Sequence, residues 1–329
     1  MFLTDVYGRK IDYLRISLTP KCNFNCFYCR PKGDCLPTDY PPLLKKKEIE
    51  SIIRVAAGLG VKKIRLTGGE PLLKPDLLNI IRFISGTEGI EDISLTTNGF
   101  FLAKKAAKLK EAGLNRVNIS LDSLNQKKFQ EITGSGSLEK IMAGMEAALQ
   151  AELTPLKINM VVIKGVNDAE IADFAALTLD KDIHIRFIEY MPLGEGHDNW
   201  SQQYMPVKDI KEACASLGPL AKVEGVKGNG PAQHYRLQGA MGVLGFISPI
   251  SEHFCRSCNR FRVTSDGKLK PCLFSKQEVD LKDSMTDEAA LRQAFIEAIN
   301  LKPSPLNPPC LVEEELGGAR PRGMVEIGG

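Results

Sequence analysis

From residue 13 to residue 189 the chain alternates short apolar runs with longer stretches whose apolar residues recur at helical spacing. The short runs predict strands buried on both faces, and the longer stretches predict amphipathic helices. The predicted strands are residues 13–18, 63–67, 92–96, 116–121, 156–163 and 184–189. The predicted helices between them are residues 46–59, 76–84, 103–112, 138–151 and 169–179.

A strand, a helix and a following parallel strand, repeated along the chain, are typical of an α/β fold with a parallel sheet. Two architectures fit the six predicted strands: an open doubly wound sheet, and an incomplete (β/α)6 TIM-type barrel. Periodicity alone does not choose between them.

The pattern changes after residue 193. Residues 225–231 are rich in Gly and Pro, and shorter strand-like runs follow at 234–237, 242–246 and 261–264. Residues 286–300 have the spacing of a helix, and the tail after Pro303 is expected to be extended. We therefore expect a first domain over residues 1–222 and a smaller α+β domain over residues 223–329.

Composition adds limits to this picture. The 329 residues are 43% hydrophobic and 25% charged, which is typical of a soluble globular protein. The net charge of +3, from 43 basic and 40 acidic residues, gives no general attraction to nucleic acid or to an anionic membrane. Residues 1–5 lack the features of a signal peptide, so we expect a cytoplasmic protein with no nucleic-acid or membrane partner.

Six of the nine cysteines form two triplets. Cys22, Cys26 and Cys29 follow the first predicted strand with the spacing C-x3-C-x2-C. Three thiolates on a four-iron cluster leave one iron open to a small molecule. Structural zinc is the alternative, with Cys35 as a fourth ligand.

The second triplet is Cys255, Cys258 and Cys272. Here zinc is a fairer rival, because His253 could complete a Cys3His site. The other three cysteines, Cys35, Cys214 and Cys310, match no motif and are expected to be buried or incidental thiols.

The first triplet, within KCNFNCFYC at residues 21–29, resembles the motif of the radical S-adenosylmethionine (SAM) enzymes, with Tyr28 at the aromatic position. The TGGEP segment at residues 67–71 supports this resemblance. Its glycines would let a ligand approach the backbone, and Glu70 could accept a hydrogen bond from an ammonium group. The resemblance implies that SAM chelates the open iron and that one-electron reduction cleaves it to a 5′-deoxyadenosyl radical.

Residues 258–273, CNRFRVTSDGKLKPCL, resemble the second cluster region of the GTP 3′,8-cyclase family, and the similarity covers nearly the whole chain. This resemblance implies two [4Fe-4S] clusters, a barrel fold and GTP as substrate, with catalytic roles for Arg260 and Arg262. The implied SAM-binding residues are Tyr28, Gly69, Ser120 and Met191. The implied nucleotide-binding residues are Arg15, Arg65, Thr96, Lys157, Arg260, Phe261 and Arg262.

The same resemblance implies a one-electron donor, a homodimer and a downstream cyclic pyranopterin monophosphate synthase that acts on the product. It also implies that the terminal Gly328-Gly329 pair reaches into the active site, since residues without side chains can thread a narrow gap. Two rival hypotheses remain: a radical SAM enzyme that modifies peptides with an auxiliary cluster, and a two-cluster electron carrier.

Overall fold

The computed structural model describes residues 2–30, 41–193, 199–226, 230–307 and 322–328. Within them the six predicted strands form a parallel series, each hydrogen-bonded to the next. These strands are β1 (Tyr13–Ser17), β2 (Lys63–Thr67), β3 (Asp92–Thr97), β4 (Arg116–Ser120), β5 (Leu156–Val162) and β6 (Ile183–Glu189).

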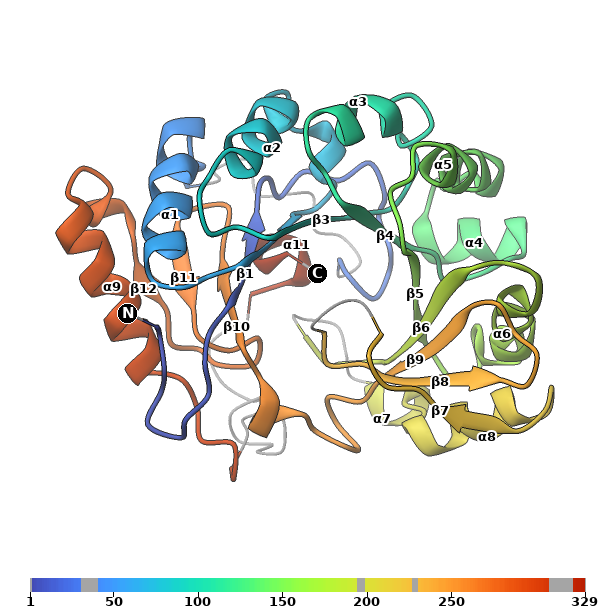
Figure 1. The fold of residues 1–329 in the computed structure, drawn as a ribbon. Helices are drawn as coiled ribbons and strands as arrows, with labels where there is room; N and C mark the ends of the chain where they lie inside the picture. The colour runs from blue at the N-terminus through green and yellow to red at the C-terminus, as the bar shows by residue number, and fades with distance from the viewer. Residues whose placement is uncertain (1, 31–40, 194–198, 227–229, 308–321, 329) are drawn as a thin grey trace.

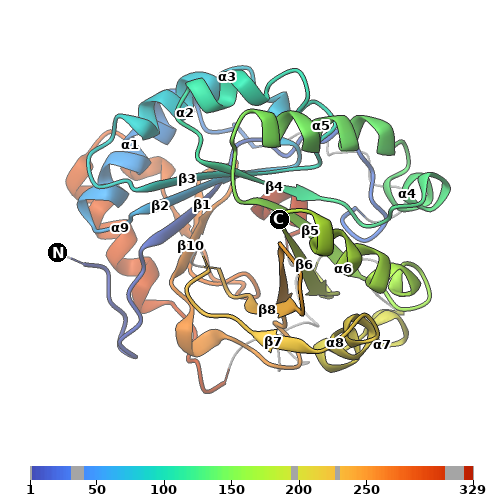
Figure 2. The same ribbon diagram turned by 45° about the vertical axis from the view of Figure 1, so that its right-hand side comes forward.

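The helices that connect these strands lie on the outer side of a curved sheet (Figures 1 and 2). They are α1 (Lys46–Gly58), α2 (Leu77–Ser85), α3 (Ala106–Glu111), α4 (Gln126–Thr133), α5 (Leu138–Gln150) and α6 (Ile171–Asp180). A doubly wound sheet would carry helices on both faces. The single outer layer therefore confirms the incomplete barrel.

The C-terminal part of the chain extends the same sheet at both edges, in the order β12-β11-β10-β1 to β6-β9-β8-β7. Strand β10 is parallel to β1 and β9 is parallel to β6, whereas the outer strands are antiparallel. The added strands are β7 (Leu220–Lys222), β8 (Gln233–Leu237), β9 (Val243–Ile247), β10 (Arg260–Val263), β11 (Lys268–Lys270) and β12 (Val279–Asp280). The division at residue 222 stays a prediction.

Four further helices belong to this part of the chain: α7 (Trp200–Gln203), α8 (Val207–Ala215), α9 (Glu288–Asn300) and α11 (Met324–Ile327). Helix α9 packs beside α1 on the outer layer. Helix α11 and the C-terminal end lie on the inner side of the curved sheet (Figures 1 and 2). Residues 322–328 thus lie in the barrel interior, and residues 324–327 form a short helix where the sequence predicted an extended or loop-like tail.

Alternate residues of the strands face opposite sides of the sheet. One set is apolar and packs under the helices, as Leu14 and Ile16 of β1 and Ile64 and Leu66 of β2 do, each with 0% exposure. The other set faces the barrel interior and is largely polar. The strands are buried on both faces as predicted, but only the outer face is an apolar core.

Candidate active site

The two cysteine triplets lie at opposite ends of the barrel. The first triplet follows β1, at the end where the parallel strands finish. Cys255 and Cys258 precede β10, whose first residue, Arg260, is in register with Tyr13 at the start of β1. Because β11 runs antiparallel to β10, Cys272 after β11 returns to this same end. The interior of the barrel therefore separates two sets of three thiols.

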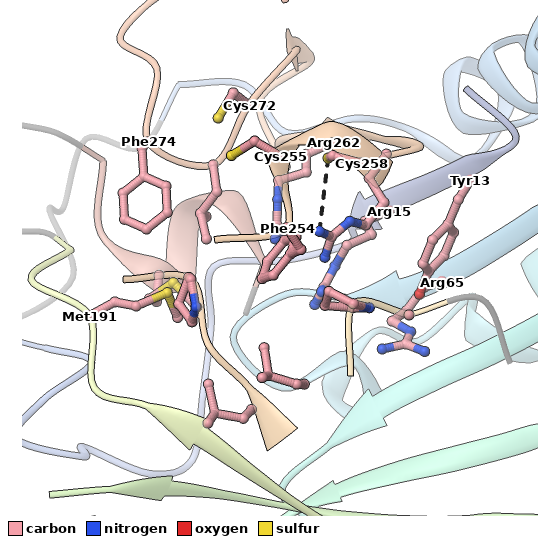
Figure 3. Close-up of a pocket in the computed structure, with 18 of the residues that line it drawn as sticks. Tyr13, Arg15, Arg65, Met191, Phe254, Cys255, Cys258, Arg262, Cys272 and Phe274 are labelled. Atoms are coloured by element: carbon pink, nitrogen blue, oxygen red, sulfur yellow. Dashed lines mark hydrogen bonds between the residues drawn. The ribbon is translucent and has the colours of Figure 1, made fainter. Parts of the chain in front are cut away.

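A cavity on the inner face reaches the second triplet (Figure 3). All three of its cysteines line the cavity, together with Met191 from the segment after β6. In Figure 3 these cysteines lie on the upper side of the pocket, and Tyr13 and Arg65 lie to their right. Other polar residues that line it are Arg15, Asn159, Arg186, Arg260 and Arg262.

The strand register explains why so many cations meet in the barrel. Arg262, Arg15, Arg65, Ser94 and Arg116 occupy consecutive in-register positions from β10 to β4, so all of them point to the interior. The Arg65 Nε donates to Ser94 Oγ at 3.1 Å, and its guanidinium lies over the Tyr13 ring at 5.4 Å. Arg116 pairs with Asp92.

Lys157 and Arg186 extend this cationic row along β5 and β6. Burial, reinforced by Arg186, Arg116 and Arg65, lowers the pKa of Lys157 to about 6. Burial and Arg65 lower the pKa of Arg186 to about 9. Burial and the Arg262 charge hold the pKa of Arg15 well below its usual range. The interior therefore favours a polyanion, which would relieve the repulsion between these groups.

Several buried polar atoms on this inner face have no hydrogen-bond partner within the described residues. They include Tyr13 OH, Ser17 Oγ, Thr67 Oγ1, Asn159 Oδ1 and Arg186 Nε. Such atoms are typical of a site that binds a polar ligand.

At the first triplet, Cys22, Cys26 and Cys29 are free thiols that retain partial exposure. Burial and the charges of Cys22 and Asp122 raise the pKa of Cys29 to about 12, despite the opposing effect of Arg30. Three thiolates at this place need a compensating positive group, which the irons of a cluster supply. The Phe24 N–H donates to Cys22 Sγ at 3.4 Å, as a thiolate ligand would accept. These residues fit a cluster.

The GGE turn after β2 braces this triplet. A Cβ on Gly69 would lie 2.4 Å from the Lys21 carbonyl oxygen, so only glycine lets the turn pass this close to the backbone beside the triplet. Glu70 is fully buried and accepts from Leu72 N, Thr97 Oγ1 and Asn98 N at 2.9, 2.7 and 2.8 Å. These three donors orient the carboxylate and leave acceptor capacity on it, so acceptance from a bound ammonium group stays a prediction.

Two residues that the sequence analysis missed support the predicted SAM residues. Asp122 accepts from the Tyr28 hydroxyl at 2.5 Å and from Val161 N at 2.9 Å. Asn98 donates to Asn23 Oδ1 at 2.9 Å and to Cys22 Sγ at 3.8 Å. Both follow the ends of strands, which is the positional signal that could have found them.

At the second triplet, neighbouring cations lower the pKa of one thiol, that of Cys258. Burial alone would raise the pKa of Cys258, but Arg260 and Lys302 lower it to about 6. The Arg260 Nη2 lies 3.8 Å from Cys258 Sγ (dashed line in Figure 3). A thiolate at neutral pH is the form that binds iron, so Cys258 suits the role of a cluster ligand, whereas burial raises the pKa of Cys272.

Of the two rival zinc sites, the one at the first triplet depends on Cys35, which the structure does not describe. Within the described residues, no three His, Cys, Asp or Glu side chains are arranged to hold a single metal ion. Cys214 is a buried thiol of α8, as expected. Cys35 and Cys310 lie outside the described residues.

The predicted nucleotide residues are distributed unevenly. Arg15, Arg65, Arg260 and Arg262 line the cavity. Thr96 accepts from Asn118 Nδ2 at 3.5 Å, on the inner face of β3. Lys157 is the second residue of β5, near its beginning. Lys157 therefore lies toward the end of the barrel opposite to the first triplet.

Phe261 differs from its neighbours on β10. Its side chain has 0% exposure and contacts the Phe295 ring of α9, with ring centroids 6.4 Å apart. Alternation along β10 places Arg260 and Arg262 inside the barrel and Phe261 outside. The expected nucleotide contact of Phe261 can therefore involve only its backbone.

The described end of the C-terminal tail lies inside the barrel, where the resemblance places the terminal glycine pair. Gly328 O accepts from Arg262 Nη1 at 2.9 Å, and a Cβ on Gly328 would lie 2.2 Å from Thr67 Oγ1. Arg322 anchors the tail through Asp266 at 2.9 Å and Glu278 at 3.0 Å. Gly329 lies outside the described residues.

No helix in the described part of the chain has the length and apolar character needed to span a membrane.

Two family models match the chain. The Radical SAM superfamily model matches residues 16–178, and the Molybdenum Cofactor Synthesis C model matches residues 183–307. Among solved structures, Streptococcus suis SuiB bound to S-adenosylmethionine has a TM-score of 0.60 at 15% identity, covering 89% of this chain and 69% of that one. Native anSMEcpe with bound AdoMet has a TM-score of 0.59 at 17% identity, covering 89% and 84%. Both likenesses show the fold.

Curated relatives are much closer in sequence. The GTP 3′,8-cyclase of Listeria welshimeri is 45% identical, with 99% of each chain covered. That of Heliobacterium modesticaldum is 44% identical, covering 99% of this chain and all of the relative. This full-length similarity, together with the two triplets at opposite ends of one barrel, shows that the chain belongs to the GTP 3′,8-cyclase family of radical S-adenosylmethionine proteins.

Proposed function

We propose that this protein converts GTP to (8S)-3′,8-cyclo-7,8-dihydroguanosine 5′-triphosphate, in the first step of molybdenum cofactor biosynthesis. The observation that carries the proposal is the cationic interior between two cysteine triplets. A radical generated at one end of the barrel can reach a nucleotide whose base is held at the other end. Holding the reacting carbons together is the main contribution of the protein.

Cys22, Cys26 and Cys29 hold the first [4Fe-4S] cluster, and Cys255, Cys258 and Cys272 hold the second. When bound, the first cluster and SAM supply the radical that takes hydrogen from the ribose 3′ carbon. The SAM site uses Tyr28, Gly69, Ser120 and Met191. Asp122 fixes the Tyr28 ring through its hydroxyl.

Different cations bind different parts of the nucleotide. Arg260 lies beside Cys258 and therefore serves the base end, together with Arg15 and Arg262. Arg65, Thr96 and Lys157 bind the triphosphate. Arg186 joins this group, because its Nη2 is held by Asn118 Oδ1 at 2.8 Å and its Nε is left without a protein partner among the described residues.

Arg260 and Arg262 have a catalytic role in this scheme. Attack of the 3′ carbon radical on C8 of guanine forms the new C–C bond and leaves the unpaired electron on the base. One electron from a one-electron donor and one proton then complete the product, and the added electron places electron density on the base. Fixed guanidinium groups beside the base stabilise that density without reorganising. Phe261 contributes through its backbone alone, because its side chain belongs to the core.

The wider setting follows from this chemistry. We propose a cytoplasmic location, since open iron–sulfur clusters need a reducing compartment. A one-electron donor reduces the first cluster, and cyclic pyranopterin monophosphate synthase acts on the product. We also propose a homodimer whose chains each contain domains 1–222 and 223–329.

GTP deuterated at the ribose 3′ carbon tests the proposal. Anaerobic incubation with SAM and a reductant should place deuterium in 5′-deoxyadenosine and yield a cyclic nucleotide that has lost it. The peptide-modifying hypothesis predicts unlabelled 5′-deoxyadenosine and unchanged GTP, and that result would refute the proposed function. An electron carrier would form no 5′-deoxyadenosine.

A further inference from the structure

A buried lysine that no part of the proposed mechanism uses lies against the second triplet. Lys302 follows helix α9 and has only 5% of its surface exposed. Its Nζ donates to Pro271 O at 2.8 Å, to Arg260 O at 3.0 Å and to Cys258 Sγ at 3.6 Å. One ammonium group thus links the segment before β10, which carries Cys258, to the segment after β11, which carries Pro271.

Arg9, from the other end of the chain, fixes the surroundings of this lysine. Its Nη1 donates to Cys255 O at 3.1 Å and its Nη2 to Pro303 O at 2.6 Å, while Asp5 holds its Nε at 2.5 Å. Pro303 is the residue next to Lys302. The N-terminal segment therefore ties the Cys255 backbone to the residue that follows Lys302.

The three contacts of Lys302 use all three hydrogens of its ammonium group. The group cannot rotate away from Cys258 without leaving a buried donor unpaired, which is costly. The Phe261 ring, 5.6 Å from Nζ, closes one side of the site. The result is a fixed positive charge and an N–H···S hydrogen bond at one cluster ligand.

Net charge and hydrogen bonds to sulfur are among the factors that set the reduction potential of an iron–sulfur cluster. Adding one electron makes a cluster more negative by one charge. A buried cation beside a ligand sulfur stabilises that reduced form more than the oxidised form. Removing the cation shifts the potential to a more negative value.

We propose that Lys302 is a positioning residue of the second cluster, which holds Cys258 and raises the reduction potential of that cluster relative to an uncharged site. The inference rests on the proposed function, because it requires iron at the second triplet. Arg9 supports the same role by fixing the segment that carries Lys302.

Replacement of Lys302 by Met removes the charge with little change in volume, and Lys302→Arg keeps the charge. Lys268→Met is the control, because this lysine of β11 pairs with Asp280 of β12 and has no sulfur contact among those described. The measurement is a reductive titration of the reconstituted full-length protein, followed by electron paramagnetic resonance. The second cluster is identified as the signal that changes when GTP is added, and the first as the signal that changes with SAM.

Lys302→Met should shift the potential of the GTP-responsive signal to a more negative value and leave the SAM-responsive signal unchanged. Lys302→Arg should keep the potential close to that of the unmodified protein, and Lys268→Met should leave the potential unchanged. An unchanged potential in fully loaded Lys302→Met overturns the proposal. If Lys302→Met loses the second cluster, retention by Lys302→Arg supports the proposal, and loss in both variants overturns it.

Failure of the proposed function can be distinguished from failure of the Lys302 proposal. If no signal responds to GTP in the unmodified protein, the proposed function fails. The Lys302 proposal is then tested in a variant whose first triplet is replaced by Ala, where a single remaining signal should show the same negative shift with Lys302→Met. No shift in that background would overturn it.

Discussion

Lys157 is buried on β5 within the influence of the Arg186, Arg116 and Arg65 charges, and this makes it sensitive to pH. Burial and its cationic neighbours bring its pKa to about 6, so the free protein carries a largely neutral Lys157 above pH 7. A bound triphosphate favours the charged form and raises that pKa. Binding of GTP should therefore take up a proton at Lys157.

The first prediction follows from linkage. Because binding takes up a proton, the affinity for GTP should fall as pH rises from 7 to 8.5, by up to about tenfold per pH unit if one full proton is taken up. Calorimetry in two buffers of different ionisation enthalpy measures the uptake. Lys157→Arg, which keeps its charge throughout this range, should bind GTP with no uptake at this site. Equal proton uptake by both proteins would contradict the role of Lys157.

The second prediction concerns Arg260 and Arg262. Replacing either by Ala should lower cyclic product on the order of 100-fold, as loss of a fixed electrostatic donor does. Formation of 5′-deoxyadenosine should continue, because the first triplet lies at the other end of the barrel. Chromatography of both products checks the ratio. Arg236→Ala, at an exposed position on β8, is the control. An unchanged product yield would remove Arg260 or Arg262 from the catalytic set.

At this scale the cysteines are predictable, because three thiols at fixed spacing carry their chemistry in the sequence. The cationic interior is not predictable in the same way. Arg15 and Arg65 sit in runs that are apolar enough to predict strands, and only the pairing of β1 with β2 puts them side by side. Lys302 and Arg9 are harder still, since each reaches the second triplet from a distant part of the chain.

At the scale of elements, helix α11 and the glycine after it occupy the inner side of the barrel (Figure 1). Gly328 has φ +76°, a left-handed conformation that favours glycine, and has no room for a side chain beside Thr67. The Arg262 Nη1 donates a hydrogen bond to the Gly328 carbonyl oxygen. The tail thus helps to place Arg262, for which a catalytic role is proposed.

The third prediction tests this element. Gly328→Val should displace the tail and lower product formation on the order of tenfold while both clusters remain. A C-terminal tag should have the same effect. Gly323→Ala is a matched control, since an added Cβ would lie no closer than 3.8 Å to any heavy atom compared there. Iron content and product yield are measured together. Full activity of Gly328→Val would separate the tail from catalysis.

The sequence predicts the repeating elements well, since all six parallel strands and five of the connecting helices lie within a few residues of their predicted positions. Helix α4 was missed. Its bounds depend on Asn125, whose side chain accepts from Lys128 N, and on Gly134 at φ +78°. The short strands β7, β11 and β12 were also missed. Segments of two or three residues carry no periodicity and form only because the sheet edge is there to pair with.

At the scale of the whole molecule, one continuous sheet sets the separation between the two triplets. Strands β1 and β10 are parallel and in register, and the triplets flank opposite ends of this pair. Local patterns could not reveal this, because residues 29 and 255 are far apart in the chain. The arrangement supports the proposal that the barrel starts a radical at one end and holds the nucleotide base at the other.

The iron content of anaerobically purified protein tests this account most directly. Two four-iron clusters predict about eight irons per chain, and replacing either triplet by Ala should leave about four. The variant without the second triplet should still cleave SAM, and the variant without the first should not. Zinc at both triplets of the unmodified protein would contradict the account, as would loss of all iron when only one triplet is removed.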